Sequence, residues 1–131
     1  MSRAQSILLC LLLACVTSTG GRRQAAKPPD SDAGPRAVLA QFVAAIEAQR
    51  WSEAYTMLSA RWRVQLTPAR LATDYAGSEA VGRGATARVK GLLAGGALLV
   101  VGKERAVLPV GEGRAAVVLL EDDAWKVDAL E

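Results

Sequence analysis

The chain has 131 residues, a formal net charge of +3 and no histidine, and its two cysteines, Cys10 and Cys15, lie close to the N-terminus. Without histidine there are no imidazole metal ligands and no histidine base, and the rest of the chain offers neither a disulfide nor a thiolate ligand. From Arg36 onward 12 basic residues stand against 11 acidic ones, a balance that does not predict the basic surface needed for nucleic acid. We therefore expect one domain at most, with no metal, cofactor or nucleic-acid partner.

Residues 1–14 have the order of charges and apolar residues found in an export signal. Arg3 and the α-amino group make a positive start, and residues 7–14 are apolar and uncharged. A helix needs about 20 apolar residues to span a bilayer, so this run is too short to cross one. Its length suits the apolar core of a secretory signal peptide.

Cys15 ends this run in the sequence Leu12-Leu13-Ala14-Cys15, which resembles the lipobox of bacterial lipoproteins. In that family the cysteine thiol receives a diacylglyceryl group and a peptidase cuts before it. The resemblance therefore implies cleavage between Ala14 and Cys15, and a membrane partner reached through acyl chains on Cys15. Several acyl chains hold firmly, because each buried methylene contributes about 0.8 kcal/mol.

The residue after the cysteine indicates in which membrane a lipoprotein would be placed. Val16 is not the aspartate that, in the family's sorting rule, retains a lipoprotein at the inner membrane. The resemblance thus implies the cell envelope, on the periplasmic face of the outer membrane where the organism has one. Two alternatives stay open: a conventional signal cut at a small-residue site within 16–18, and an uncleaved helix that contains Cys15.

Residues 15–35 form a predicted linker between the lipidated cysteine and the folded part. They are rich in Thr, Ser, Gly, Arg, Lys and Pro and hold almost nothing to bury, so we expect them to stay disordered. A flexible segment covering 16–35 has a root-mean-square reach of about 25 Å. The folded domain is predicted to cover 36–131.

Three helices are predicted between residue 36 and about residue 76. The first carries an apolar stripe at helical spacing, made by Val38, Leu39, Phe42, Val43 and Ile46. The second repeats the pattern from Trp51 through Trp62. The third opens at Thr67-Pro68, with Thr as cap and Pro in the first turn.

After Gly77 the pattern changes to short β-prone runs separated by Gly and acidic turns. The strands are expected near 85–93, 97–101, 105–110, 114–120 and 124–130. The continuously apolar run 117–120 predicts a central strand, and Pro109 predicts an edge or a bulge. The fold class is thus α+β, with three N-terminal helices packed on a curved antiparallel sheet.

Three stretches resemble the nuclear transport factor 2-like superfamily and its small bacterial lipoproteins: FVAAIEAQRWSEAYTMLS, LTPARLATDY and the closing VVLLEDDAWKV. The resemblance implies a cystatin-like cone of helices and sheet over 36–131. The chain departs from the family in its short length and in Asp123, which stands where the last turn often has glycine.

Two classes of function follow. In the first, the domain is a non-catalytic binding or accessory module, with Trp51, Tyr55, Trp62 and Tyr75 around a pocket for a small apolar ligand. Arg61, Trp62 and Arg63 could instead be exposed and bind an envelope protein, and burial of Trp62 discriminates between the two. The alternative is a dehydratase- or isomerase-like enzyme, in which Asp74 acts with a tyrosine inside the cone.

Overall fold

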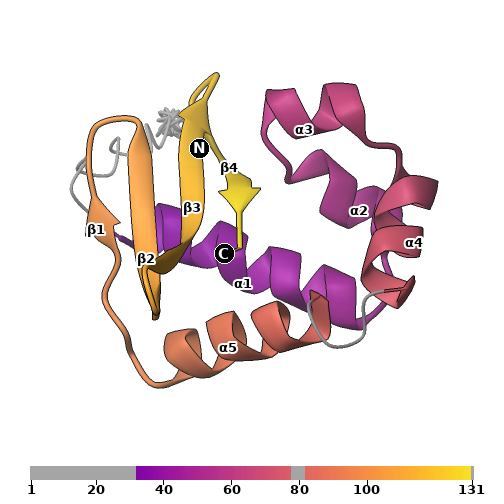
Figure 1. Ribbon diagram of the computed structural model, residues 1–131. Coiled ribbons are helices and arrows are strands. Elements are labelled where there is room, and N and C mark those ends of the chain that lie inside the picture. The colour runs from indigo at the N-terminus through magenta and orange to yellow at the C-terminus, as the bar shows by residue number, and fades with distance from the viewer. Residues whose placement is uncertain (1–31, 78–81, 131) are drawn as a thin grey trace, which may run out of the picture.

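The computed structural model describes residues 32–77 and 82–130. The predicted signal peptide, the lipobox with Ala14 and Cys15, and most of the linker lie outside these residues. Helices pack against one antiparallel sheet, so the α+β class is confirmed (Figure 1). None of the helices within the described part is both long and apolar enough to cross a bilayer.

Helix α1 (Ala33–Glu47) is the longest element and lies behind the sheet (Figure 1). It begins at Ala33, three residues before the boundary predicted for the domain. The predicted stripe is confirmed, because Leu39, Phe42, Val43 and Ile46 are all buried. Past the helix end, Gln49 has a left-handed φ of 57°, which turns the chain toward α2.

The predicted second helix is wrong in its middle, where the chain forms two short helices. Helix α2 (Trp51–Thr56) and helix α3 (Ala60–Gln65) are separated by 57–59. These three residues add to the sheet, since Ser59 N–H donates to the Val127 carbonyl and Val127 N–H donates to the Met57 carbonyl, both at 2.8 Å. Pairing with a sheet edge satisfies the same backbone groups that a continuous helix would use.

Helix α4 (Pro68–Gly77) confirms the third predicted helix. Its cap is also as expected, because the Thr67 hydroxyl accepts the Arg70 N–H at 3.1 Å. Leu71 is buried.

The strand predicted at 85–93 is wrong, because helix α5 (Gly82–Ala94) occupies this segment. Ala85, Thr86 and Val89 are buried, and Leu92 and Leu93 pack against the core. That spacing is helical, and a strand would bury alternate residues. The Thr86 hydroxyl, which favours a strand by composition, donates instead to the Gly82 carbonyl one turn earlier, at 2.6 Å.

The sheet is an antiparallel meander in the order β1-β2-β3-β4. The strands are β1 (Val100–Val101), β2 (Arg105–Gly111), β3 (Arg114–Glu121) and β4 (Ala124–Ala129). The last three predicted strands are confirmed, and the one at 97–101 contracts to two residues. The central position of 117–120 is confirmed, and so is a register shift at Pro109.

One face of the sheet, which we call the inner sheet face, packs on α1 and α5. Its buried residues are Ala106, Leu108, Ala116, Val118 and Val127. The opposite face, the outer sheet face, is turned away from these two helices (Figure 1). Helices α2, α3 and α4 lie beside β4, and this side group of helices forms the candidate site.

Candidate ligand-binding cavity

A cavity of about 180 Å³ lies between the end of β4 and helices α3 and α4. Most of its wall is apolar, and its polar groups come from three side chains. The lining residues are Phe42, Leu58, Trp62, Leu66, Leu71, Asp74, Tyr75, Val127, Asp128, Ala129 and Leu130. An apolar wall with a few polar groups is typical of sites for small organic ligands.

Trp62 closes the cavity on the α3 side. Its ring is half-buried, and its Nε1–H donates to the backbone carbonyl of Asp128. The Arg61 guanidinium covers the outer face of the ring, 5.0 Å from the ring centroid. Because the indole N–H is used internally and the ring is shielded by Arg61, Trp62 contributes to a cavity wall more than to an exposed docking surface.

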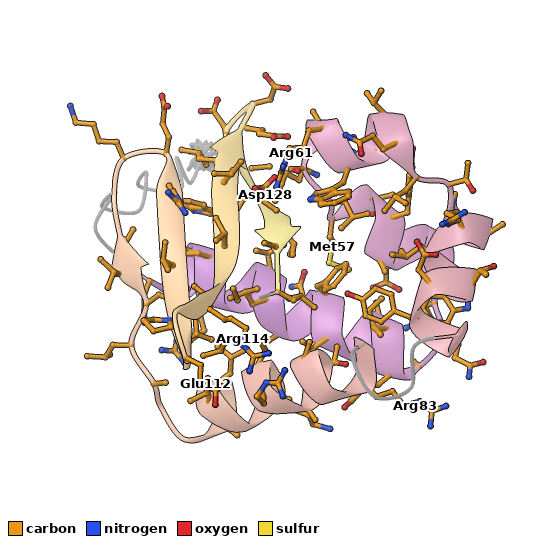
Figure 2. All side chains as sticks on the ribbon, viewed as in Figure 1. Met57, Arg61, Arg83, Glu112, Arg114 and Asp128 are labelled. Carbon is orange, nitrogen blue, oxygen red and sulfur yellow. The ribbon has the colours of Figure 1, made fainter. Side chains whose placement is uncertain are left out.

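Asp128 anchors α3 to the sheet. Its carboxylate accepts hydrogen bonds from the Ser59 hydroxyl at 2.7 Å and from Arg61 Nε and Nη2 at 2.6 and 2.8 Å. Figure 2 shows Arg61 and Asp128 facing each other between α3 and β4. This two-point pairing fixes the orientation of both side chains.

The same contacts set the charge of Asp128. Burial alone raises the pKa of the carboxyl group and is the largest single influence on it. Hydrogen bonds from Arg61 and Ser59, with the charges of Arg61 and Arg105, outweigh burial and hold the pKa of Asp128 below its ordinary value. In turn, the hydrogen bond to Asp128 raises the pKa of Arg61.

Tyr75 comes from α4 and forms the opposite wall. Burial raises the pKa of its hydroxyl to about 12, so the group is a neutral phenol at physiological pH. Its ring lies 6.4 Å from the Trp51 ring, tilted by 38°. A neutral hydroxyl can both donate and accept a hydrogen bond to a ligand.

The other predicted aromatic residues have different surroundings. The Tyr55 hydroxyl donates to the Arg63 carbonyl at 2.7 Å, which ties α2 to the end of α3. Trp51 lines a second hollow of about 380 Å³ with Tyr75, between α1, α4 and α5. The structure therefore brings Trp62 and Tyr75 together at the cavity, and places Trp51 and Tyr55 outside its lining.

Asp74, the carboxylate of the alternative enzyme hypothesis, lies at the cavity rim. Its side chain is 43% exposed and pairs with Arg70 at 2.8 Å on the same helix. A carboxylate that takes a proton from carbon in this class of enzyme is desolvated. Asp74 is thus only partly buried, and one of its two oxygens, Oδ1, is held by Arg70.

Three contributors to the site have no signal in the sequence: Ser59, Asp128 and Leu130. Ser59 and Asp128 are 69 residues apart in the chain, and only the parallel pairing at Val127 brings them together. Leu130 follows the last strand and resembles any other apolar terminal residue. From the sequence, Ser59 would be interpreted only as a helix N-cap. In the structure its hydroxyl makes no cap hydrogen bond and donates to Asp128 instead.

Among the residues that the structure describes, no three His, Cys, Asp or Glu side chains are grouped to hold a metal ion. The cavity thus offers apolar contact, the carboxylates of Asp74 and Asp128, and the neutral phenol of Tyr75. Comparisons with protein-family models, with curated proteins and with solved structures found no match to the chain.

Proposed function

We propose that this protein is a membrane-anchored lipoprotein of the bacterial cell envelope whose domain binds a small, mostly apolar ligand without catalysis. The LLAC sequence behind a short uncharged apolar run supports the anchor. The placement of helices before an antiparallel meander that closes with the hairpin 114–129 supports an abbreviated nuclear transport factor 2-like domain. The function itself depends on one observation, the apolar cavity beside Trp62 and Tyr75.

The size of the cavity limits the ligand. An apolar cavity of about 150 Å³ in another protein accepts benzene, so about 180 Å³ suits one ring or a short branched chain. The Tyr75 hydroxyl is the neutral polar group among the lining side chains, and Asp128 is occupied by Ser59 and Arg61, so we assign the orienting role to Tyr75. We therefore infer a ligand with one hydroxyl or carbonyl on an apolar body.

Binding can be tested with phenol and benzene as probes, by calorimetry and by the shift in melting temperature. We expect both to raise the melting temperature and phenol to bind more tightly. Ala129→Leu, which fills part of the cavity, should abolish the effect. Ala124→Leu is the matched control, because Ala124 lies on the same strand and is exposed. Equal effects of the probes on both variants would refute the cavity as a binding site.

The anchor is tested separately, by the intact mass of protein extracted from membranes. We expect a chain that begins at Cys15 and carries acyl groups. Cys15→Ser should leave the chain unprocessed and without lipid. A polypeptide that starts at Met1, or at a residue after Cys15 without lipid, would refute the anchor and leave the cavity proposal standing.

A further inference from the structure

The outer sheet face carries a row of apolar side chains, and in Figure 1 none of the described helices lies in front of it. Strand register places Val100, Val107 and Val117 side by side across three strands. Side chains directly opposite one another in antiparallel strands lie on the same face. The three valines therefore form one apolar row, of which Val100 is 69% exposed.

The row continues before β1. Leu98 is 79% exposed, Leu99 is 7% exposed and Val100 is again exposed. This alternation directs Leu98 and Val100 to the same side, away from the core. Two of the large apolar side chains most exposed in the described part of the chain thus border the outer sheet face.

Basic residues stand beside this apolar row. Arg105 and Lys126 both pair with Leu119 in the register, one from each side, so all three share the outer sheet face. Arg105 is exposed, and Lys126 Nζ donates one hydrogen bond to the Thr56 carbonyl at 2.9 Å. Two acidic side chains nearby are held within the domain: Glu121 accepts the Ala60 N–H at 2.9 Å, and Asp128 is paired with Arg61. Apolar side chains flanked by cations are the combination that binds the phosphate and acyl boundary of a lipid surface.

The position of the chain entry permits such contact. Arg36, in the first turn of α1, donates to the carbonyl groups of Leu93 and Ala97, directly before Leu98. The chain therefore enters the domain beside the β1 edge of the sheet. The 17 residues between Cys15 and Ala33 extend at most about 60 Å, and a sheet with one helix layer is only about 20 Å thick.

We propose that the outer sheet face rests on the phospholipid surface to which the chain is anchored; this inference depends on the anchor proposed for Cys15. An anchored domain meets the bilayer at high effective concentration, so a weak apolar and basic surface is sufficient to bind. Docking orients the domain relative to the bilayer.

The test uses the acylated protein in vesicles of phosphatidylethanolamine and phosphatidylglycerol. An environment-sensitive fluorophore is placed on Val100→Cys, and on Val64→Cys as the matched control. Val64 is 88% exposed and lies on α3, at the opposite edge of the sheet from β1. We expect spin-labelled lipids to quench the probe at position 100 several-fold more strongly than at position 64.

Each outcome has a distinct meaning. Weak quenching at both positions, with the protein still bound to vesicles, would overturn the docking and preserve the anchor. Equal strong quenching would show an unoriented domain and would also overturn it. In a parallel sample of the unlabelled Val100→Cys protein treated with a mild oxidant, a disulfide-linked dimer through position 100 would identify a second copy as the occupant in place of lipid. Failure to recover acylated protein from membranes would instead refute the anchor.

Discussion

Tyr75 lines both the cavity and the second hollow. Because its hydroxyl is buried, the free energy of unfolding should decrease at high pH. The pKa is about 12 in the folded protein and about 10 in the unfolded chain. Between these values the unfolded chain loses the proton and the folded protein keeps it, so stability falls as pH rises. Below pH 10 both states are protonated and the effect vanishes.

Tyr75→Phe tests this dependence. The wild type should lose about 2 to 3 kcal/mol of unfolding free energy through this group between pH 10 and pH 12, and the variant should lack that loss. Chemical denaturation of both proteins at pH 8 and at several values up to 12 measures the difference, and the pH 8 data subtract the constant effect of the substitution. Parallel curves for the two proteins would contradict the burial of the hydroxyl.

Gly34 lies where α1 passes Trp125 of the sheet, with no room for a side chain. A β-carbon added there would lie 2.8 Å from Cδ1 and Nε1 of Trp125, closer than atoms in proteins approach. The indole is a rigid ring between α1 and the sheet, so it cannot move away at low cost. We expect Gly34→Ala to destabilise the protein by about 1 to 3 kcal/mol, as overpacked cores do.

Gly91 provides the control for Gly34. It is exposed in α5, and a β-carbon there would meet nothing within 4 Å. Gly91→Ala should stabilise the protein by about 0.5 to 1 kcal/mol, because alanine favours a helix over glycine. Urea denaturation of the two variants should give shifts of opposite sign. Stabilisation by both substitutions would show that Trp125 yields readily.

At the scale of elements, the β3–β4 turn places two aspartates in a backbone conformation that usually favours glycine. Asp122 and Asp123 connect the paired residues Glu121 and Ala124, and their φ values are 48° and 62°. Two left-handed residues in a two-residue loop make a type I′ turn, whose second position prefers glycine. Aspartate tolerates this conformation better than most residues do.

Asp123→Gly should therefore stabilise the hairpin by about 0.5 kcal/mol, and Asp123→Ala should destabilise it by about 1 kcal/mol. Thermal melts of the three proteins should follow the order glycine, aspartate, alanine. An alanine variant as stable as the wild type would show that this turn does not require a left-handed residue.

The helices and strands were predictable where local patterns decided them. Helix α1, helix α4 and the strands from residue 105 onward follow from apolar spacing and from turn residues such as Gly113 and Asp123. Helix α5 was missed, because Thr86 and Val89 favour strands and the glycines weaken a helix. Its helical state comes from packing on α1, which no local pattern records.

The break between α2 and α3, and with it the site, was beyond sequence reasoning. It exists because β4, far along the chain, offers an edge at Val127 to which 57–59 can pair. Trp62 and Tyr75 were recognised as aromatic residues of interest, but their partner Asp128 follows only from that pairing. Contacts over such separations depend on the complete fold.

At the scale of the whole molecule, α3 is the helix whose attachment to the sheet depends most on polar contacts. Leu58 is buried, but α3 itself contains no fully buried residue. Hydrogen bonds hold it to the strands: the Trp62 indole N–H donates to the Asp128 carbonyl, and the Ala60 N–H donates to the Glu121 carboxylate. Arg61 also pairs with the Asp128 carboxylate. Segments with few buried contacts open locally at lower free energy than the core. Since Leu58, Trp62 and Leu66 line the cavity, such opening is a route for a ligand.

Asp128→Asn tests this route, because it keeps the shape of the side chain and removes the charge that binds Arg61. We expect hydrogen exchange to accelerate in residues 57–66 and to stay unchanged in α1. Acid should have a related effect on the wild type, because the pKa of Asp128 is lower in the folded protein than in the unfolded chain. The stabilisation that ionised Asp128 contributes is complete above the ordinary pKa of about 4. It is lost as the pH falls through the lower pKa of the folded protein. Ala124→Leu, exposed on the same strand, serves as the control. Faster exchange throughout the molecule would show global destabilisation, and unchanged exchange in 57–66 would show that apolar contacts alone hold α3 to the sheet.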